Sequence, residues 1–219
     1  RAVVICQREE DLHDPRMGCN TQTSAPCKTC GHRSDTCPGH IGCIVLVDYL
    51  YNILFLSEVV KLANAVTYKG RFKQKGDRVF DSFSSGDFSA NDMYTLLSNV
   101  NEVAMKEFGW GDRPEYALIK NMVVAPHCCR PNLFHNGTTI RDGLTYRYAD
   151  IIRLNNVLAG LQNAPKHVRD DIRRQQQWMV TTLLDSNEQS GEFYRRKSEK
   201  VFFEGLKQRL TGKHGRVRA

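Results

Sequence analysis

Cys27-Lys-Thr-Cys30 and, six residues later, Cys37-Pro-Gly-His40 form the stretch that decides how the N-terminal part of this chain folds. The two ligand-type side chains of each pair are separated by two residues, so each pair can hold one metal ion from a tight turn. The loop between the pairs can then bring all four side chains together as a tetrahedron. The spacing predicts a structural zinc site, because four protein ligands leave no position open for water or substrate.

Other ligand sets stay open, because Cys19, Cys43 and His32 lie close by in the sequence. We interpret these three as packed or surface groups, since the four-residue set is already complete. Residues 1–43 show little hydrophobic periodicity, so zinc binding would supply folding free energy, on the order of 10 kcal/mol or more. Four disulfides are the alternative for eight cysteines. No signal-peptide pattern precedes them, which favours reduced thiols and a metal.

Outside this segment, hydrophobic periodicity predicts helices over 49–66, 89–109 and 144–161. A further helix is predicted after Pro165, a residue suited to a first helical turn. Glycine-rich punctuation over 67–90 indicates a loop or weak hairpin, and two nearby prolines predict an extended loop over 121–142. Cys128 and Cys129 are interpreted as loop or interface residues. The predicted fold class is mostly α, with an irregular zinc-bound N-terminal lobe and few short strands.

Positive charge gathers at the C-terminal end. The formal net charge is +7, and residues 190–219 hold nine Lys or Arg against three Glu. This distribution predicts contact with a polyanion, although a solvated basic tail is the alternative. Arg216 and Arg218 lie two residues apart and would point the same way from an extended segment. Aromatic residues among these charges could stack on bases, but ordinary packing is the favoured interpretation.

Asp14-Pro-Arg-Met-Gly18, followed by the Cys/His set, resembles the opening of the largest subunit of eukaryotic, archaeal and large-DNA-virus RNA polymerases. Three later stretches are similar to that family in the same order. They are Arg113-Pro-Glu-Tyr with Val123-Val-Ala-Pro and Arg130-Pro131, then Gly143 to Asn155, then Leu206 to Arg218. The ordered set covers nearly the whole chain and is far more specific than any one motif.

The resemblance implies a polymerase clamp core, with the four Cys/His residues as ligands of the clamp zinc. It also implies nucleic-acid contacts in two basic stretches. These residues are Lys207, Arg209, Lys213, Arg216 and Arg218 in a switch segment, and Arg195, Arg196 and Lys197 in a rudder-like segment. The implied divisions are a zinc-binding segment (1–43), a trimmed helical clamp head (44–123), a lid-like loop (124–142), clamp helices (143–187) and a rudder-like and switch segment (188–219).

Two departures from the family stand out. Residues 67–110 contain no cysteine, so the family's second zinc site has no counterpart here. The lid-like stretch from Ala125 to Pro131 is poorer in proline than is usual in the family. This short, divergent form points to a viral or otherwise fast-evolving polymerase. The chain starts without Met and stops inside the switch motif, so we expect both ends to be internal to a longer chain.

The functional expectation is a part of a DNA-directed RNA polymerase, a nucleotidyltransferase, in which the clamp holds the DNA template and the RNA–DNA hybrid. Catalytic Mg²⁺ needs closely spaced carboxylates, and these are expected outside this chain, since Asp170-Asp171 is a poor substitute. Expected partners are the second-largest and smaller subunits, with initiation and elongation factors, and no membrane. The expected location is the nucleus, or a cytoplasmic viral factory or virion for a viral enzyme. The alternatives are a stand-alone zinc-knuckle nucleic-acid-binding protein and a non-enzymatic interaction module.

Overall fold

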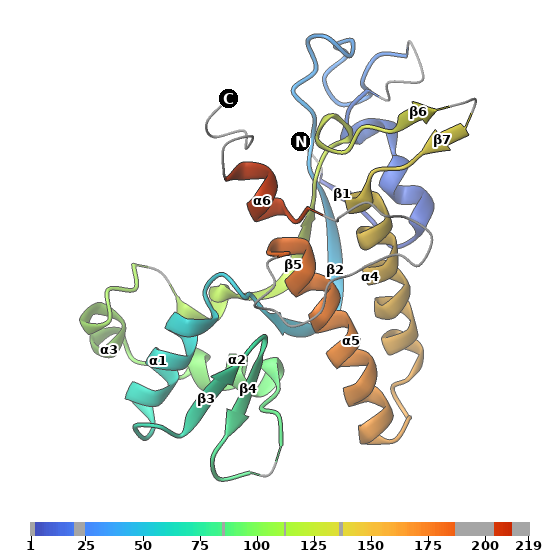
Figure 1. Cartoon of the computed structure of the whole chain (residues 1–219). Helices are drawn as coiled ribbons and strands as arrows, with labels where there is room; N and C mark the ends of the chain where they lie inside the picture. The colour runs from blue at the N-terminus through green and yellow to red at the C-terminus, as the bar shows by residue number, and fades with distance from the viewer. Residues whose placement is uncertain are drawn as a thin grey trace. The chain divides into compact units, whose positions relative to one another are not determined.

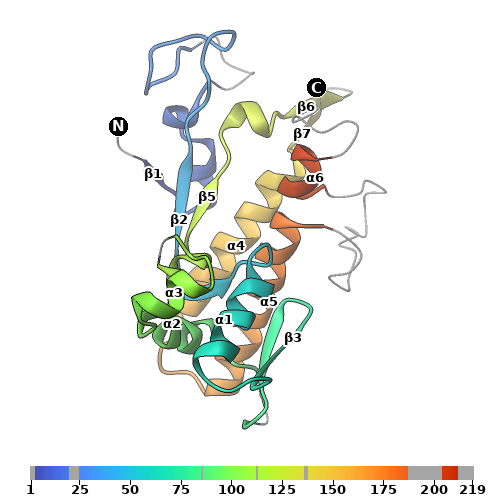
Figure 2. The ribbon, with the colours of Figure 1, turned by 90° about the vertical axis from the view of Figure 1, so that its left-hand side faces the viewer.

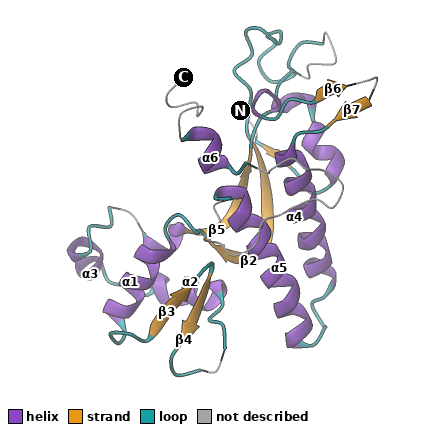
Figure 3. Cartoon of the chain, viewed as in Figure 1, coloured by secondary structure: helices purple, strands orange, loops and turns teal. Residues whose placement is uncertain are grey.

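A computed structural model describes residues 3–19, 25–84, 86–111, 113–135, 138–186 and 204–211. Helices make up most of the regular structure, and the strands are few (Figure 3). The prediction of a mainly helical chain with few strands is therefore confirmed. The chain divides into two compact units, one of residues 1–47 and 121–179 and one of residues 48–120 and 180–219. No helix of the described residues is long and apolar enough to cross a membrane.

The first unit contains most of a three-stranded sheet with the order β1 (Val4–Ile5), β2 (Gly42–Tyr51) and β5 (Leu118–Val124). β1 is parallel to β2. Next to this sheet runs α4 (Gly143–Gly160), visible in Figure 1 and Figure 2, and α5 (Lys166–Leu184) follows it in the chain. The remaining elements are the 3-10 helices η1 (Glu9–His13), η2 (Pro15–Met17) and η4 (His127–Cys129), and the antiparallel pair β6 (Leu133–His135) and β7 (Thr138–Ile140).

An asparagine on α4 completes the hydrogen bonding of β2 where β1 ends. The Asn155 Oδ1 atom accepts from the Val47 backbone N–H at 2.8 Å, and its Nδ2 atom donates to the Val45 carbonyl at 3.0 Å. A side-chain amide carries the same donor and acceptor as a peptide group, so it can replace a neighbouring strand. This explains why a polar residue shares a face of α4 with the buried Tyr148 and Ile151.

The second unit is a small helical domain with one β-hairpin. Its elements are α1 (Leu56–Val66), β3 (Phe72–Lys75), β4 (Arg78–Asp81), α2 (Ala90–Ser98), α3 (Glu102–Glu107), η3 (Pro114–Ala117) and α6 (Leu206–Leu210). The apolar faces of α1, the hairpin and α2 form one core, which contains Leu56, Val59, Leu62, Phe72, Val79, Met93 and Leu97. Residues 67–90, predicted as a loop or weak hairpin, form the β3–β4 hairpin, with Gly76 at a φ of 63° in its turn.

The helix predicted over 49–66 is wrong at its start. Tyr49 to Tyr51 belong to β2, and α1 begins only at Leu56. Along β2 the buried residues Ile44, Leu46 and Leu50 alternate with less buried ones, which is the period of a strand. Apolar residues at this spacing also satisfy part of a helical pattern, so periodicity alone could not place the boundary.

Two other predicted segments are subdivided in the structure. The helix expected over 89–109 is split into α2 and α3, because Asn101 caps a new helix by accepting from the Ala104 N–H at 2.8 Å. Asparagine competes for backbone hydrogen bonds in this way and interrupts helices. The loop expected over 121–142 contains the end of β5, η4 and the β6–β7 pair. The helix expected over 144–161 corresponds closely to α4, which is capped by Asp142.

Candidate metal centre and basic segment

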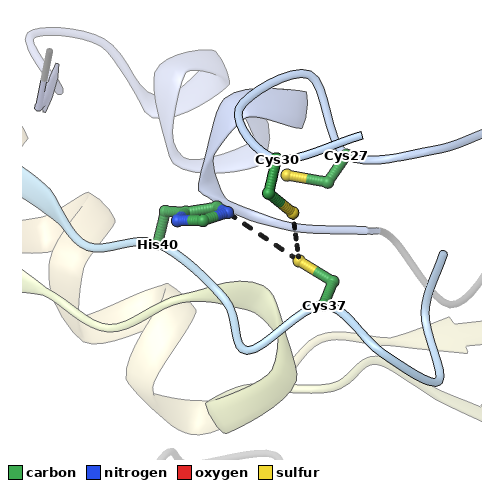
Figure 4. A group of neighbouring side chains, drawn as sticks. All are labelled: Cys27, Cys30, Cys37 and His40. Atoms are coloured by element: carbon green, nitrogen blue, oxygen red, sulfur yellow. Dashed lines mark hydrogen bonds between the residues drawn. The ribbon is translucent and has the colours of Figure 1, made fainter. Parts of the chain in front are cut away.

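Cys27, Cys30, Cys37 and His40 converge on one point in the first unit (Figure 4). All four ligand atoms lie within 4.8 Å of one another. The Sγ atoms of Cys30 and Cys37 are 3.6 Å apart, and Cys37 Sγ is 3.9 Å from His40 Nε2. A tetrahedral zinc site with metal–sulfur bonds of about 2.3 Å has ligand–ligand separations of about 3.8 Å. These residues therefore fit a zinc ion, which they would hold with three sulfur atoms and one nitrogen.

The first ligand pair lies on a tight turn made by the backbone. The Gly31 N–H donates to the Cys27 carbonyl at 2.8 Å, and the Cys27 N–H donates to the His32 carbonyl at 2.9 Å. Within the turn, the Thr29 N–H points at the Cys27 sulfur from 3.4 Å. Backbone N–H groups aimed at a sulfur stabilise a thiolate, which is the form that binds a metal.

The thiol pKa values reflect this arrangement. Burial opposes ionisation of Cys27, but the backbone N–H groups of Cys30 and Thr29 outweigh it and lower the pKa of Cys27. Desolvation, together with the neighbouring sulfur atoms of Cys37 and Cys27, raises the pKa of Cys30. Several thiolates packed together repel one another, so a cation at their centre is what allows all of them to lose their protons.

The Asp14–Gly18 motif supports the ligand turns from one side. The Asp14 carboxylate accepts from the Arg16 N–H at 2.8 Å and from the Arg16 side chain, and Met17 is fully buried. The Met17 carbonyl then accepts from the His40 N–H at 3.1 Å. Gly18 has a φ of 127°, a conformation that other residues rarely adopt. The motif is thus a scaffold that fixes the position of His40.

Residues 125–130 support the same lobe from more than 100 positions further along the chain. The His127 ring lies between two carbonyls, with Nδ1 3.2 Å from Gly18 O and Nε2 3.1 Å from Leu12 O. Arg130 is buried, and its guanidinium donates to Leu12 O and to the Thr145 hydroxyl. This role of His127 and Arg130 was not predicted from the sequence. The only signal was a pair of polar residues between prolines, since the partners lie more than 100 residues away.

Gly39, in the second ligand turn, allows Pro126 and Cys128 to approach that turn closely. A Cβ atom on Gly39 would lie 2.7 Å from both Cys128 Sγ and Pro126 Cβ, so only glycine fits there. Cys128 also reaches the Pro38 carbonyl, at 3.7 Å. Cys128 is therefore a packing partner of the ligand turn, and it lies outside the four-residue metal group.

Cys19, Cys43 and His32, the other ligand types near in sequence, lie outside the metal group. Cys19 donates from Sγ to the His32 carbonyl at 3.2 Å, and the His32 side chain is exposed. Burial raises the pKa of Cys43, which disfavours the thiolate that a metal ligand needs. Among the described residues, the metal-capable group consists of Cys27, Cys30, Cys37 and His40.

Two of the predicted basic residues lie on α6. Lys207 makes an ion pair with Asp185, with Nζ 2.6 Å from Oδ2, and Arg209 donates from Nε to the Glu204 carbonyl at 3.2 Å. Further bonds connect Ser186 with Gly205 and Gln208, so α6 is fixed to the end of α5. The remaining predicted residues lie outside the described residues: Arg195, Arg196, Lys197, Lys213, Arg216 and Arg218.

Comparison with known proteins adds a family match. The family described as RNA polymerase Rpb1, domain 1, matches residues 69–219. DNA-directed RNA polymerase II subunit RPB1 of Euplotoides octocarinatus is 25% identical over 94% of this chain and 58% of its own length. DNA-directed RNA polymerase subunit Rpo1N of Methanothermobacter thermautotrophicus (strain Winter) is 26% identical over 96% of this chain and 31% of its own length. The chain therefore spans less than two thirds of these relatives.

Both alignments are longer than the chain itself. They run over 281 and 278 residues, whereas the chain has 219. The relatives therefore contain residues that have no counterpart in this chain.

Proposed function

The chain belongs to the RNA polymerase Rpb1, domain 1, family, the N-terminal region of the largest subunit, and on that premise we propose that it forms part of the polymerase clamp. In this role it holds the DNA template and the RNA–DNA hybrid while the complete enzyme, a DNA-directed RNA polymerase, synthesises RNA. The observation that carries the proposal is the Cys27, Cys30, Cys37 and His40 group, which sits at the place in the chain that the resemblance assigns to the clamp zinc.

The metal in this group is proposed to be structural Zn²⁺. Three thiolates and an imidazole are ligands that zinc prefers, and together they fill its tetrahedral shell. No coordination position is left for a reacting water, so the ion would contribute folding free energy instead of catalysis. The turns that carry the ligands contact residues 14–18 and 125–130, so loss of the metal would loosen both segments.

The chemistry of RNA synthesis is proposed to lie elsewhere in the enzyme. Phosphoryl transfer of this kind uses carboxylates that hold two Mg²⁺ ions. The neighbouring carboxylates of Asp170 and Asp171 each make an ion pair, with Arg173 and Arg174 respectively. Mg²⁺ is proposed to be bound by a part of the polymerase outside this chain.

The basic C-terminal segment is proposed to contact nucleic-acid phosphates. Lys and Arg neutralise phosphates without reading base sequence, which suits an enzyme that moves along any template. On α6, the Lys207 ammonium pairs with Asp185 and so also helps to fix the helix. Lys207 and Arg209 are both proposed to contact the strand. Lys213, Arg216 and Arg218 would continue this contact as the switch segment, and Arg195, Arg196 and Lys197 would act from the rudder-like segment.

Residues 44–123 are proposed to be a reduced clamp head. The longer alignments show that some segments of the relatives have no counterpart here, and we propose that part of these segments belongs to the clamp head. The second unit nevertheless forms its own apolar core, without any cysteine between residues 67 and 110. Packing of α1, α2 and the β3–β4 hairpin would take over the stabilising role of the family's second zinc site.

Mass spectrometry of the proteins that co-purify with the chain, gently isolated from its source, tests the proposal. We expect the second-largest and smaller polymerase subunits, the portion of the enzyme that carries the Mg²⁺ site, and initiation or elongation factors. Isolation of the chain alone, or only with nucleic acid, would overturn the proposal in favour of a stand-alone zinc-knuckle binding protein. Imaging of the tagged chain in its host then distinguishes a nuclear enzyme from one in a cytoplasmic viral factory or virion.

A further inference from the structure

The β3–β4 hairpin has two chemically different faces. The register pairs Lys73 with Phe80 and Lys75 with Arg78, so these four side chains share one face, here named the outer face. The opposite face carries Phe72 and Val79, which are buried in the core of the second unit at 2% and 0% exposure. The core therefore fixes the hairpin in place from behind. On the outer face Arg78 is ion-paired with Asp87 at 3.1 Å, and Lys73 and Lys75 are the exposed cations.

Positive charge is in excess on and around this hairpin. Residues 68–84 contain five Lys or Arg and two Asp. Both aspartates are engaged, Asp81 with Arg71 at 2.9 Å and Asp77 through a hydrogen bond with Thr181. Lys73 and Lys75 are exposed, so the surplus charge lies at the surface. An anionic partner would neutralise it.

Aromatic rings accompany these charges. Tyr68 is 68% exposed and Phe83 is 74% exposed, and their ring centroids are 6.2 Å apart in an edge-to-face arrangement. The Arg71 guanidinium lies 5.7 Å from the Phe83 centroid and is held there by Asp81. Exposure of large apolar rings to water is energetically unfavourable. Two such rings side by side, with the Arg71 guanidinium against one of them, therefore indicate a ligand with flat, apolar surfaces.

We propose that the β3–β4 hairpin, with Lys73 and Lys75 on its outer face and the exposed rings of Tyr68 and Phe83 at the end away from its turn, is a binding surface for single-stranded DNA. Lysines two residues apart on a strand can follow a phosphate backbone, and exposed rings stack on unpaired bases. In duplex DNA the bases are already paired and stacked on one another, so they could not stack on the Tyr68 and Phe83 rings. An acidic protein segment would use the lysines but offers no flat rings to Tyr68 and Phe83. The proposal rests on the proposed polymerase function in one respect: the single-stranded DNA would come from the duplex that the polymerase opens.

Fluorescence anisotropy of the 219-residue chain with a labelled 20-nucleotide oligo-dT probe tests the surface. Lys73→Gln with Lys75→Gln should weaken binding about tenfold and make the dependence of log K on log salt shallower by about 1.4, since two phosphate contacts are lost. Tyr68→Ser with Phe83→Ser should weaken binding by a similar factor without changing the salt slope, because stacking releases no counterions. Lys61→Gln with Lys106→Gln removes the same charge from exposed positions on α1 and α3 and should change neither quantity.

Equal affinity of the parent, the charge variant and the aromatic variant for oligo-dT would overturn the proposal. Loss of poly-glutamate binding in the charge variant, with oligo-dT binding unchanged, would also overturn it and assign the face to an acidic protein. The mutated side chains are exposed, and circular dichroism with thermal unfolding verifies that each variant keeps its fold. Failure here leaves the polymerase assignment intact, because that assignment is tested by the proteins that co-purify with the chain.

Discussion

The Arg130 guanidinium donates to the main-chain carbonyl of Leu12, so two residues from opposite parts of the sequence are bonded inside the first unit. The same guanidinium donates from Nε to the Ala125 carbonyl at 2.7 Å and from NH1 to the Thr145 hydroxyl at 3.2 Å. Arg130 is only 3% exposed. One buried cation therefore joins the segment before the metal ligands, the lid-like segment and α4.

Replacement of Arg130 should destabilise the first unit strongly. Arg130→Met keeps much of the apolar volume but removes the hydrogen bonds that the guanidinium donates to Leu12, Ala125 and Thr145. Each such loss costs about 1–3 kcal/mol, so the free energy of unfolding should fall by about 3 kcal/mol or more. Urea titration of the zinc-loaded chain measures the change.

The matched control is Arg141→Met, which removes an arginine of the same unit that is ion-paired to Glu9 at 2.7 Å with both side chains over 40% exposed. Surface pairs of this kind contribute less than about 1 kcal/mol. Equal effects of Arg130→Met and Arg141→Met would show that the buried hydrogen bonds have no special importance.

The metal ligands can be tested by zinc content. Cys27→Ser with Cys30→Ser removes two of four ligands, so the chain should lose its zinc and residues 14–43 should unfold. Elemental analysis gives zinc per chain, and limited proteolysis reports the unfolding. Cys128→Ser with Cys129→Ser is the control, since both thiols lie outside the metal group and should leave zinc content unchanged. One zinc per chain in the Cys27, Cys30 variant would refute the ligand assignment.

How far the sequence predicts this site depends on the distance between partners along the chain. The four metal ligands fall within 14 residues, and their spacing alone predicted that they meet. The bonds from His127 and Arg130 to Leu12 and Gly18 join residues 109 to 118 positions apart, and no local pattern encodes them. The boundary between β2 and α1 was predicted wrongly for another reason. The apolar residues of this stretch fit both the period of a strand and the period of a helix.

His127 should make stability depend on pH. Burial and then the charge of Arg130 lower the pKa of His127 below the ordinary imidazole value of about 6.5. The unfolded chain therefore takes up a proton more readily than the folded chain. The stabilising contribution of neutral His127 is present above about pH 6.5 and is lost as the pH falls toward the folded pKa.

The measurement compares the free energy of unfolding of the parent and His127→Gln between about pH 7.5 and 5.5. The parent should lose stability more steeply than the variant as the pH falls. The pKa of His13 is lowered by burial and also by the nearby His127, so His13 is replaced by Gln in both proteins and the comparison isolates His127. Zinc content is verified at each pH. Parallel pH profiles for the two proteins would contradict the assignment of a depressed pKa to His127.

Because the Asn155 amide takes the place of a neighbouring strand, its replacement should lower the stability of the sheet. Asn155→Leu keeps a similar size but removes both bonds to β2, leaving the Val47 N–H and the Val45 carbonyl without this partner. We expect the free energy of unfolding to fall by about 2 kcal/mol and amide exchange at Val47 to accelerate. Asn156→Leu is the control, because Asn156 donates from an exposed position to the Gln7 carbonyl. A similar loss in both variants would mean that β2 does not depend on the Asn155 amide.

The switch assignment predicts a change in salt dependence as well as in affinity. Arg216→Ala with Arg218→Ala should weaken binding of the chain to a DNA template, because two phosphate contacts are lost. The slope of log K against log salt should also become shallower, by about 1.8 on duplex DNA. Arg8→Ala with Arg153→Ala removes the same charge at exposed sites of the first unit and should leave the slope unchanged. An unchanged affinity and slope in the Arg216, Arg218 variant would exclude these arginines from the template contact, and the basic segment would then be a solvated tail.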